Sequence, residues 1–225
     1  MNDCLFFGLN NKPILIKNEP EEITKPIQFK FKNENKNEKQ IKQISSGRYS
    51  TIFLFKNGKA IEYLKDDLYD YLFKEEDEYE SEDLNPSEIQ IENIQKVTVG
   101  ALNEAILTKE GNVFAKGNYI NPKNRKEFIN ISSLIEDTND RIIEDIVSGA
   151  YSIYLLTSNQ NVYGIGSNEY GQLGFDSVTL YKAEKPILMM KNVSKIFSGI
   201  ASIHVFLLNS NQKLFGCGDN YYGQL

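Results

Sequence analysis

The amino-acid sequence predicts an all-β fold in which one four-stranded sheet is repeated along the chain. Glycines recur about every 50 residues, and paired apolar runs flank tight-turn sequences. The leading glycine of each repeat advances by 53, 49 and 50 residues through Gly47, Gly100, Gly149 and Gly199. A hairpin cannot bury a face alone, and about 50 residues is the length of a four-stranded propeller blade with its connections. We therefore expect a series of stacked antiparallel sheets.

A second glycine column has the same period. It contains Gly117, Gly166 and Gly218, with steps of 49 and 52 residues, and Gly8 lies 109 residues before Gly117. All six prolines fall between the repeats. Random composition would not sort glycine and proline in this way, so we interpret the period as structural.

The first repeat, ISSGRYSTIFLFKNGKAIEYL from Ile44, predicts a strand, a turn and a further strand. Its turn contains Asn57-Gly58 between apolar runs, a strong hairpin signal, and we expect positive φ at both residues. The second repeat, from Val97, places KEGN between the predicted strands NEAILT and VFAKG. The third and fourth, from Ile146 and Ile196, carry the turn-forming sequences SNQN and SNQK.

Other repeat families with similar periods fit poorly. WD40 repeats show Gly-His and Trp-Asp pairs, but this chain has no Trp and one His. Kelch repeats show paired glycines and a Trp, and no Gly-Gly occurs here. Leucine-rich and helical repeats need shorter periods or a 3.6-residue pattern, which is absent.

The sequences VYGIGSNEYGQLG from Val162 and LFGCGDNYYGQL from Leu214 resemble the signature of the RCC1 (regulator of chromosome condensation) repeat family. The second repeat keeps the glycines without Gly-Gln-Leu-Gly, and Glu62-Tyr63-Leu64 replaces the glycine-containing strand end in the first. The resemblance implies a seven-bladed β-propeller, of which this chain would supply about four blades. We expect a single incomplete domain over 1–225, the N-terminal part of a longer chain or of a truncated gene model.

The approximate units are 44–93, 94–145, 146–195 and 196–225, after a partial first blade and loop at 1–43. The strand around Gly8 would belong to a blade that a more distant part of the propeller completes, as propellers close. An isolated piece would leave open sheet edges, which favour aggregation.

The glycine-rich motif also predicts particular contacts. Gly164 and Gly166 alternate with apolar residues, as in a strand that a neighbouring backbone approaches closely. The sequence 171–174 predicts a compact turn between blades. We expect Leu173 and Leu225 to be buried there.

His204 is the only histidine, but its alignment favours a structural role. The same column of the repeats holds short hydrogen-bonding side chains, namely Ser50, Asn103 and Ser152. A paired structural polar residue is therefore a better interpretation than a catalytic one. Cys4 and Cys217 lack the companion ligands of a zinc site, and Cys217 aligns with Ile165, which predicts a small apolar role.

Three segments depart from the repeat. The acidic run 74–83 either docks a basic partner or is a solvated insertion, and the second interpretation is favoured. Residues 66–73 predict a short helix or a degenerate strand. Residues 30–42 predict a long loop; binding of nucleic acid there is poorly supported, because Glu34 and Glu38 interrupt the positive charges.

Composition limits the class of protein. The 225 residues are 40% apolar and 25% charged, with 25 Lys+Arg against 31 Asp+Glu, which argues against broad phosphate neutralisation of nucleic acid. No secretory signal or long apolar run occurs, so we expect no membrane segment and a location in the cytoplasm or nucleus. We find no catalytic constellation, no cofactor-binding residue and no metal ligand set.

The sequence favours a non-enzymatic protein-interaction or regulatory scaffold with an unidentified protein partner. The resemblance also implies an alternative, a guanine-nucleotide exchange factor for a Ran-type small GTPase. No segment aligns with the wedge loop that such exchange would need, so no residue is carried over. Light sensing by clustered tryptophans, known in a plant branch of the family, is excluded by the absence of Trp.

Overall fold

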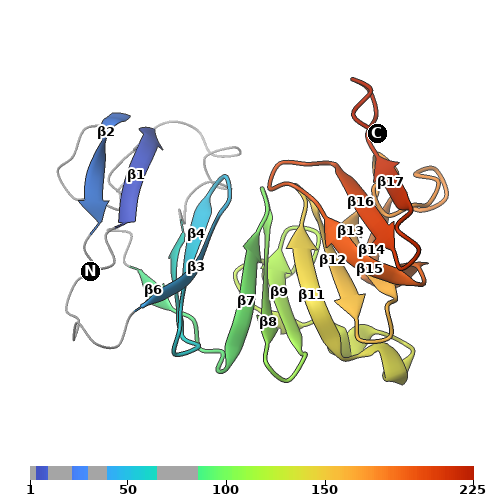
Figure 1. Ribbon diagram of the computed structural model, residues 1–225, viewed down its shortest axis with the longest axis horizontal. Coiled ribbons are helices and arrows are strands. Elements are labelled where there is room, and N and C mark those ends of the chain that lie inside the picture. Colours follow the sequence, from blue (N-terminus) through green and yellow to red (C-terminus); the bar gives the residue numbers. More distant parts are fainter. Residues whose placement is uncertain (1–3, 10–21, 30–39, 65–85) are drawn as a thin grey trace.

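The computed structural model describes residues 4–9, 22–29, 40–64 and 86–225 (Figure 1). The described part is almost entirely β-structure, with two short 3-10 helices, η1 (Ser132–Leu134) and η2 (Thr138–Asp140). No helix in these ranges is long and apolar enough to cross a membrane. The all-β class is confirmed.

Four antiparallel sheets follow one another along the chain. The first contains β3 (Ile41–Ser46), β4 (Ser50–Phe55), β5 (Ala60–Leu64) and β6 (Ser87–Glu88). The second contains β7 (Ile94–Val99), β8 (Asn103–Thr108), β9 (Val113–Gly117) and β10 (Ile129–Asn130). The third contains β11 (Ile143–Ser148), β12 (Ser152–Thr157), β13 (Val162–Ser167) and β14 (Lys182–Met190). The fourth contains β15 (Val193–Phe197), β16 (His204–Asn209) and β17 (Leu214–Gly218).

The sheets stand side by side in chain order, like blades (Figure 1). The first strands of neighbouring sheets contact one another, β3 with β7, β7 with β11 and β11 with β15. A fifth, two-stranded sheet pairs β1 (Cys4–Leu9) with β2 (Glu22–Phe29), and Gly8 lies opposite Ile23. Within each sheet neighbours in sequence are neighbours in space, which is the meander expected for a propeller blade.

The core lies between the sheets rather than at one centre. Every residue of β4, β8 and β12 is buried. For β8 and β12, a described sheet packs on each face. In the fourth sheet, β16 alternates between buried and half-buried residues, and β17 is largely exposed. Only one face of the fourth sheet is therefore covered by described residues.

The leading glycines lie at matching places in successive sheets, as the sequence predicted. A Cβ atom at Gly47 would collide with the carbonyl oxygen of Gly100, and one at Gly100 would collide with that of Gly149. At Gly149 the added Cβ would lie 2.7 Å from the oxygen of Ser202. The backbone of each sheet thus occupies the space that a side chain on the preceding sheet would need.

The hairpin turns differ from the predicted type. In the first hairpin only Gly58 has a positive φ, of 84°, so the prediction for Asn57 is wrong. The other described hairpins repeat this single left-handed position, at Gly111, Gln160 and Gln212. Phe55 N donates a hydrogen bond to Lys59 O, and Gly58 N donates one to Phe55 O. The turn closed by these two bonds needs only one left-handed residue, Gly58.

The left-handed residue also joins neighbouring sheets. Its carbonyl oxygen accepts a hydrogen bond from the first residue of the next sheet. The three donor–acceptor pairs are Ile94 N to Gly58 O at 3.0 Å, Ile143 N to Gly111 O at 3.0 Å and Val193 N to Gln160 O at 2.8 Å. The positive φ therefore serves the contact between blades as well as the turn.

Two predictions about the glycine-rich motif need correction. Gly164 makes room for side chains rather than for a neighbouring backbone, because an added Cβ would lie 2.6 Å from Met189 Sδ and 2.8 Å from Leu173 Cδ2. Leu173 is fully buried, as predicted. Leu225 is 40% exposed, so its predicted burial is wrong: it covers Gly216, but no described sheet packs over it.

Replacement of Gly100 by Ala should destabilise the protein by about 2–4 kcal/mol, because the new Cβ forces two backbones apart. Ser158→Ala is the control, because Ser158 lies exposed in a hairpin turn and makes no contact with the glycine column. The free energy of unfolding, measured by urea denaturation and circular dichroism, tests this. Equal losses in the two variants would contradict the stacking of the sheets through the glycine column.

Candidate functional site

The two ends of the sheets form two different rims. We define the loop rim by the loops that follow the first strand and the segments that follow the third strand of each sheet. Its described segments are 47–49, 100–102, 118–128, 149–151, 168–181, 198–203 and 219–225. We define the hairpin rim by the turns at 56–59, 109–112, 158–161 and 210–213. Antiparallel pairing places each set at one end.

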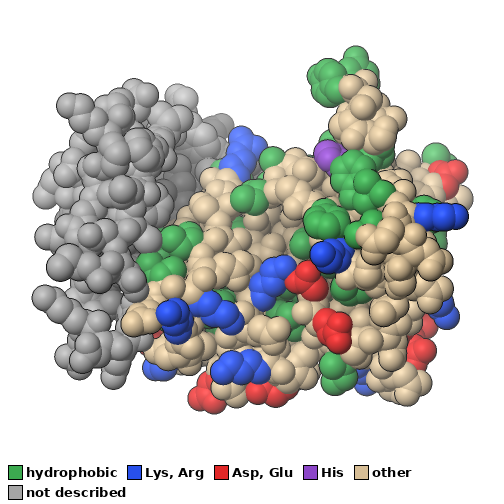
Figure 2. Space-filling view, in the orientation of Figure 1, with side chains coloured by type: hydrophobic (Ala, Val, Ile, Leu, Met, Phe, Trp, Pro, Cys, Tyr) green, Lys and Arg blue, Asp and Glu red, His purple; other side chains and the backbone are tan. Residues whose placement is uncertain are grey.

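Exposed aromatic and large apolar side chains gather on the loop rim over the third and fourth sheets. They are Tyr170, Phe175, Val178, Tyr181, Ile200, Tyr221 and Tyr222. Tyr221 and Tyr222 are more than 80% exposed, and their rings contact each other edge to face. Figure 2 shows hydrophobic side chains at the top of the fourth sheet, towards the C-terminal end. The turns of the hairpin rim contain no large apolar residue.

A carboxylate organises part of this rim. Glu169 Oε1 accepts hydrogen bonds from the hydroxyls of Tyr181, at 2.6 Å, and Tyr119, at 3.2 Å. The rings of Tyr119 and Tyr151 lie 5.9 Å apart. Burial, followed by the charge of Glu169, raises the pKa of Tyr119 to about 12, so its hydroxyl stays protonated and donates. The cluster links the segment after β9 to the loops of the third sheet.

The rim loop at 168–181 is held rigidly from below. Asn168 is fully buried; its Nδ2 donates to Phe175 O at 3.0 Å and Leu180 O at 2.6 Å. Its Oδ1 accepts from Leu173 N at 2.8 Å. The fourth sheet repeats the last bond, since Asn220 Oδ1 accepts from Leu225 N at 2.9 Å.

This asparagine belongs to the glycine-rich motif, but the motif alone does not indicate its function. The available signal was the recurrence of Asn five residues before Leu in the third and fourth repeats. An amide supplies both donors and an acceptor, which the loop needs at one point.

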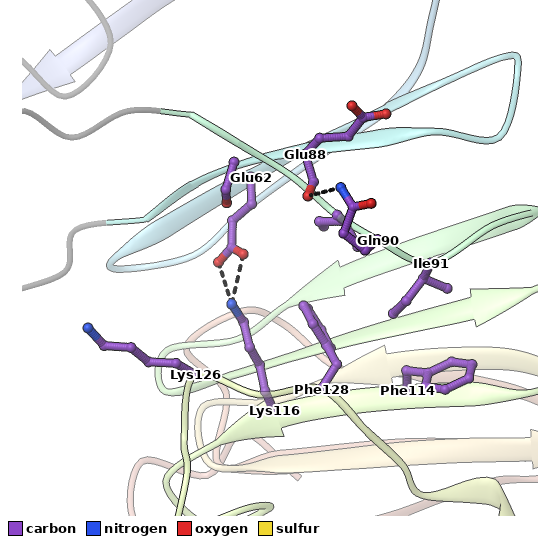
Figure 3. Close-up of a pocket in the computed structure, with 10 residues that line it drawn as sticks. Glu62, Glu88, Gln90, Ile91, Phe114, Lys116, Lys126 and Phe128 are labelled. Carbon is purple, nitrogen blue, oxygen red and sulfur yellow. Dashed lines mark hydrogen bonds and ion pairs between the residues drawn. The ribbon is translucent and has the colours of Figure 1, made fainter.

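A second candidate is a pocket of about 370 Å³ at the outer edge between the first two sheets (Figure 3). Lys116 of β9 points at Glu62 of β5, with Nζ 2.7 Å from both carboxylate oxygens. The same Nζ lies 3.5 Å from Glu104 Oε2 and 4.7 Å from the centre of the Phe128 ring. The side chains of the three charged residues are only 5–6% exposed.

The pocket therefore borders a buried group of two carboxylates and one ammonium. Burial raises the pKa of Glu104 to about 8, and the nearby charge of Glu62 acts in the same direction, while Lys116 acts against it. A protonated Glu104 leaves one negative and one positive charge in the group. The ammonium is already engaged, so this arrangement joins two sheets rather than presenting a reactive group to a ligand.

The structure places the polar column as predicted, at the first residue of each second strand. It contains Ser50, Asn103, Ser152 and His204. Asn103 Nδ2 donates to Gly149 O and Ala150 O of the next sheet, and Ser152 donates to Ser167 O. His204 is half-buried, with its ring edge to face against Phe206.

Cys217 lies opposite Val205 as Ile165 lies opposite Ile153, which agrees with the predicted alignment. Its Sγ contacts Gln172 O at 3.5 Å, and burial raises the pKa of its thiol to about 11. A thiol in that state is a poor nucleophile at neutral pH. No group of three or more potential metal ligands occurs among the described residues. The acidic run 74–83, the segment 66–73 and most of 30–42 lie outside the described residues.

Comparison with known proteins supports the family resemblance. Residues 143–172 match the model of the regulator of chromosome condensation (RCC1) repeat. The mouse serine/threonine-protein kinase Nek9 is 30% identical over 83 residues, which cover 37% of this chain and 8% of Nek9. The human probable E3 ubiquitin-protein ligase HERC4 is 30% identical over 102 residues, which cover 44% of this chain and 10% of HERC4. The chain thus spans a tenth or less of these relatives.

Solved structures agree on the fold. Human WBSCR16 superposes with a TM-score of 0.74 and 17% identity, over 95% of this chain and 56% of the other. Prp20p of Saccharomyces cerevisiae superposes with a TM-score of 0.69 and 14% identity, over 94% of this chain and 52% of the other. The predicted resemblance to RCC1 repeats and to part of an RCC1-like propeller is confirmed.

The buried charges predict an unusual dependence of stability on pH. The pKa of Glu104 is higher in the folded protein than in the unfolded chain, so the folded state holds the extra proton between about pH 4.5 and 8. The contribution of Glu104 to the free energy of unfolding is therefore fully present at low pH, and it is lost as the pH rises to about 8. Glu104→Gln should remove this loss, and it should make the protein more stable than the wild type at pH 8.

Glu62→Gln is the matched control. It removes the principal partner of Lys116 and should lower stability by about 3 kcal/mol. Urea denaturation at several pH values between 5 and 8.5 measures both effects. If the free energy of unfolding of the Glu104→Gln protein varied with pH as that of the wild type does, the assignment of the proton to Glu104 would be contradicted.

Proposed function

We propose that this RCC1-like propeller is a protein-interaction scaffold that docks a partner on the loop rim of its third and fourth sheets. The observation that carries the proposal is the gathering of exposed tyrosines on that rim, including Tyr170 and Tyr181. Tyrosine is enriched in protein interfaces, because it offers a large contact area with a hydroxyl at little cost in conformational entropy.

The rigidity of the rim supports the same proposal. The loop at 168–181 is fixed by Asn168, and Tyr181 is fixed by Glu169. A preorganised surface loses less entropy when it binds than a mobile one. Loops carried on a rigid sheet scaffold are also where recognition usually lies. We assign no catalysis to this chain, and we place it in the cytoplasm or nucleus as one repeat domain.

A second candidate is nucleotide exchange on a Ran-type small GTPase. Its support is the similarity of fold to Prp20p, whose crystal structure was described with its binding properties to Gsp1p and histones. The similarity is at 14% identity and shows the fold alone. Docking is therefore the proposal that the residues of this chain support better.

A photo-crosslinking amino acid at Tyr170 of the full-length protein, expressed in its own cells, should capture a partner protein. The same amino acid at Asn112, on the hairpin rim, is the control, and it should not capture the protein that is captured from position 170. Recombinant partner should then bind Tyr170→Ala about tenfold more weakly than the wild type, as for an interface hot spot. Capture from Asn112 alone, or unchanged binding by Tyr170→Ala, would place the interface elsewhere.

Release of labelled GDP from a Ran-type GTPase separates the two candidates. Under the docking proposal, the full-length protein leaves the release rate near that of the GTPase alone. An exchange factor would accelerate the release by several orders of magnitude, and the rate with Prp20p is the positive control. Acceleration similar to that by Prp20p would replace the docking proposal with exchange.

A further inference from the structure

We infer that the loop rim over the third and fourth sheets binds an extended, lysine- and arginine-rich segment of the partner protein, with Glu169 as its anchor. This inference rests on the proposed docking function and names the chemistry of the partner. It is carried by three observations: the absence of basic residues from this part of the loop rim, the position of Glu169 and the tyrosines around it.

Charge is segregated along the loop rim. The segments over the third and fourth sheets carry Glu169, Asp176 and Asp219, but no lysine or arginine. The whole stretch from 142 to 181 contains no basic residue. This part of the rim therefore presents negative charge only, which favours a cationic partner.

Two other described regions carry more basic than acidic residues. The turns of the hairpin rim carry four lysines and one acid, at Lys56, Lys59, Lys109, Lys213 and Glu110. The described loop rim over the first two sheets carries four basic residues and one acid, at Arg48, Lys123, Arg125, Lys126 and Glu127. Among these segments, the loop rim over the third and fourth sheets is the one without a basic residue, which favours it for a basic segment.

Glu169 is built to receive a cation. Both tyrosine hydroxyls donate to Oε1, and within the described part of the chain no hydrogen bond reaches Oε2. No lysine or arginine of the described residues forms an ion pair with this half-buried carboxylate. The fixed Oε1 holds the group in one orientation, and Oε2 is left to accept from a guanidinium or ammonium group.

The surrounding rings add a second attraction for cations. Tyr170 and Tyr181 are 50% and 58% exposed beside Glu169. The face of a tyrosine ring attracts lysine and arginine. Alternating carboxylates and rings suit an extended segment with several basic side chains better than a single cation.

The test uses a short fluorescein-labelled peptide in which Lys and Arg alternate with Gly and Ser, together with the same peptide carrying Glu at the basic positions. Fluorescence anisotropy with the full-length protein should show binding of the basic peptide only. Glu169→Gln keeps an acceptor for both hydroxyls but loses the charge, and it should weaken binding about tenfold. Tyr170→Ala should weaken it about fivefold.

Glu110→Gln is the control, because it removes one carboxylate from the opposite rim, and it should leave the affinity unchanged. Equal weakening by Glu110→Gln and Glu169→Gln, binding of the acidic peptide, or no binding of the basic peptide would overturn the inference. Capture of a partner from Tyr170 without binding of the basic peptide refutes this inference and leaves the docking function standing. Failure of both experiments refutes both.

Discussion

The close approach of backbones at the leading glycines is the constraint on which the rest of the structure depends. Gly47 and Gly100 each face a carbonyl oxygen of the following sheet, so each sheet can approach its neighbour only because a side chain is missing. The turn carbonyls of Gly58, Gly111 and Gln160 then accept hydrogen bonds from the next sheet at the opposite end. Each sheet is thus fixed to its neighbour at both ends, and the middle strands between them are fully buried. Because these contacts are local in sequence, the same arrangement can be repeated around an axis with little change.

Fixing the sheets also fixes the loops that they carry. The Glu169 cluster joins Tyr119, which lies between the last two strands of the second sheet, to Tyr181, which precedes the last strand of the third. The two tyrosines can share one carboxylate oxygen only if the two sheets keep their spacing. Asn168 does for the loop what the glycines do for the sheets, since one buried amide holds three backbone groups. The loop that carries Tyr170 and Tyr181 is therefore held in place by hydrogen bonds to Asn168 and Glu169, which is the property that a docking surface needs.

Much of the fold could be predicted from the sequence because glycine reports directly on backbone geometry. The spacing of Gly47, Gly100, Gly149 and Gly199 predicted the four sheets of three or four strands, their order and the place where they touch. The prediction of a positive φ at Asn57 was wrong, because Asn-Gly is compatible with more than one type of turn and the pairing of the strands decides between them. The exposure of Leu225 was also missed, because burial there depends on a neighbouring sheet and not on the motif itself. The Glu169 cluster could not be predicted from the sequence, since its members are up to 62 residues apart and meet only when the second and third sheets stack.

The buried charges account for the departure of the first two repeats from the glycine-rich motif. Cross-strand pairing places Glu62 in the column of Gly164, and it places Glu104 and Lys116 in the columns of Ile153 and Ile165. In the third repeat, Leu173 fills the space beside Gly164, and the first two repeats have no leucine at this position of the motif. In the first repeat, the column of Gly164 holds Glu62, whose side chain reaches Lys116 on the second sheet. The three departures from the repeat pattern, at Glu62, Glu104 and Lys116, therefore belong together. Between the first two sheets an ion pair takes the place of a leucine packed against a glycine. Glu62 or Lys116 alone would be a buried charge without its ion-pair partner, so these two residues are expected to change together.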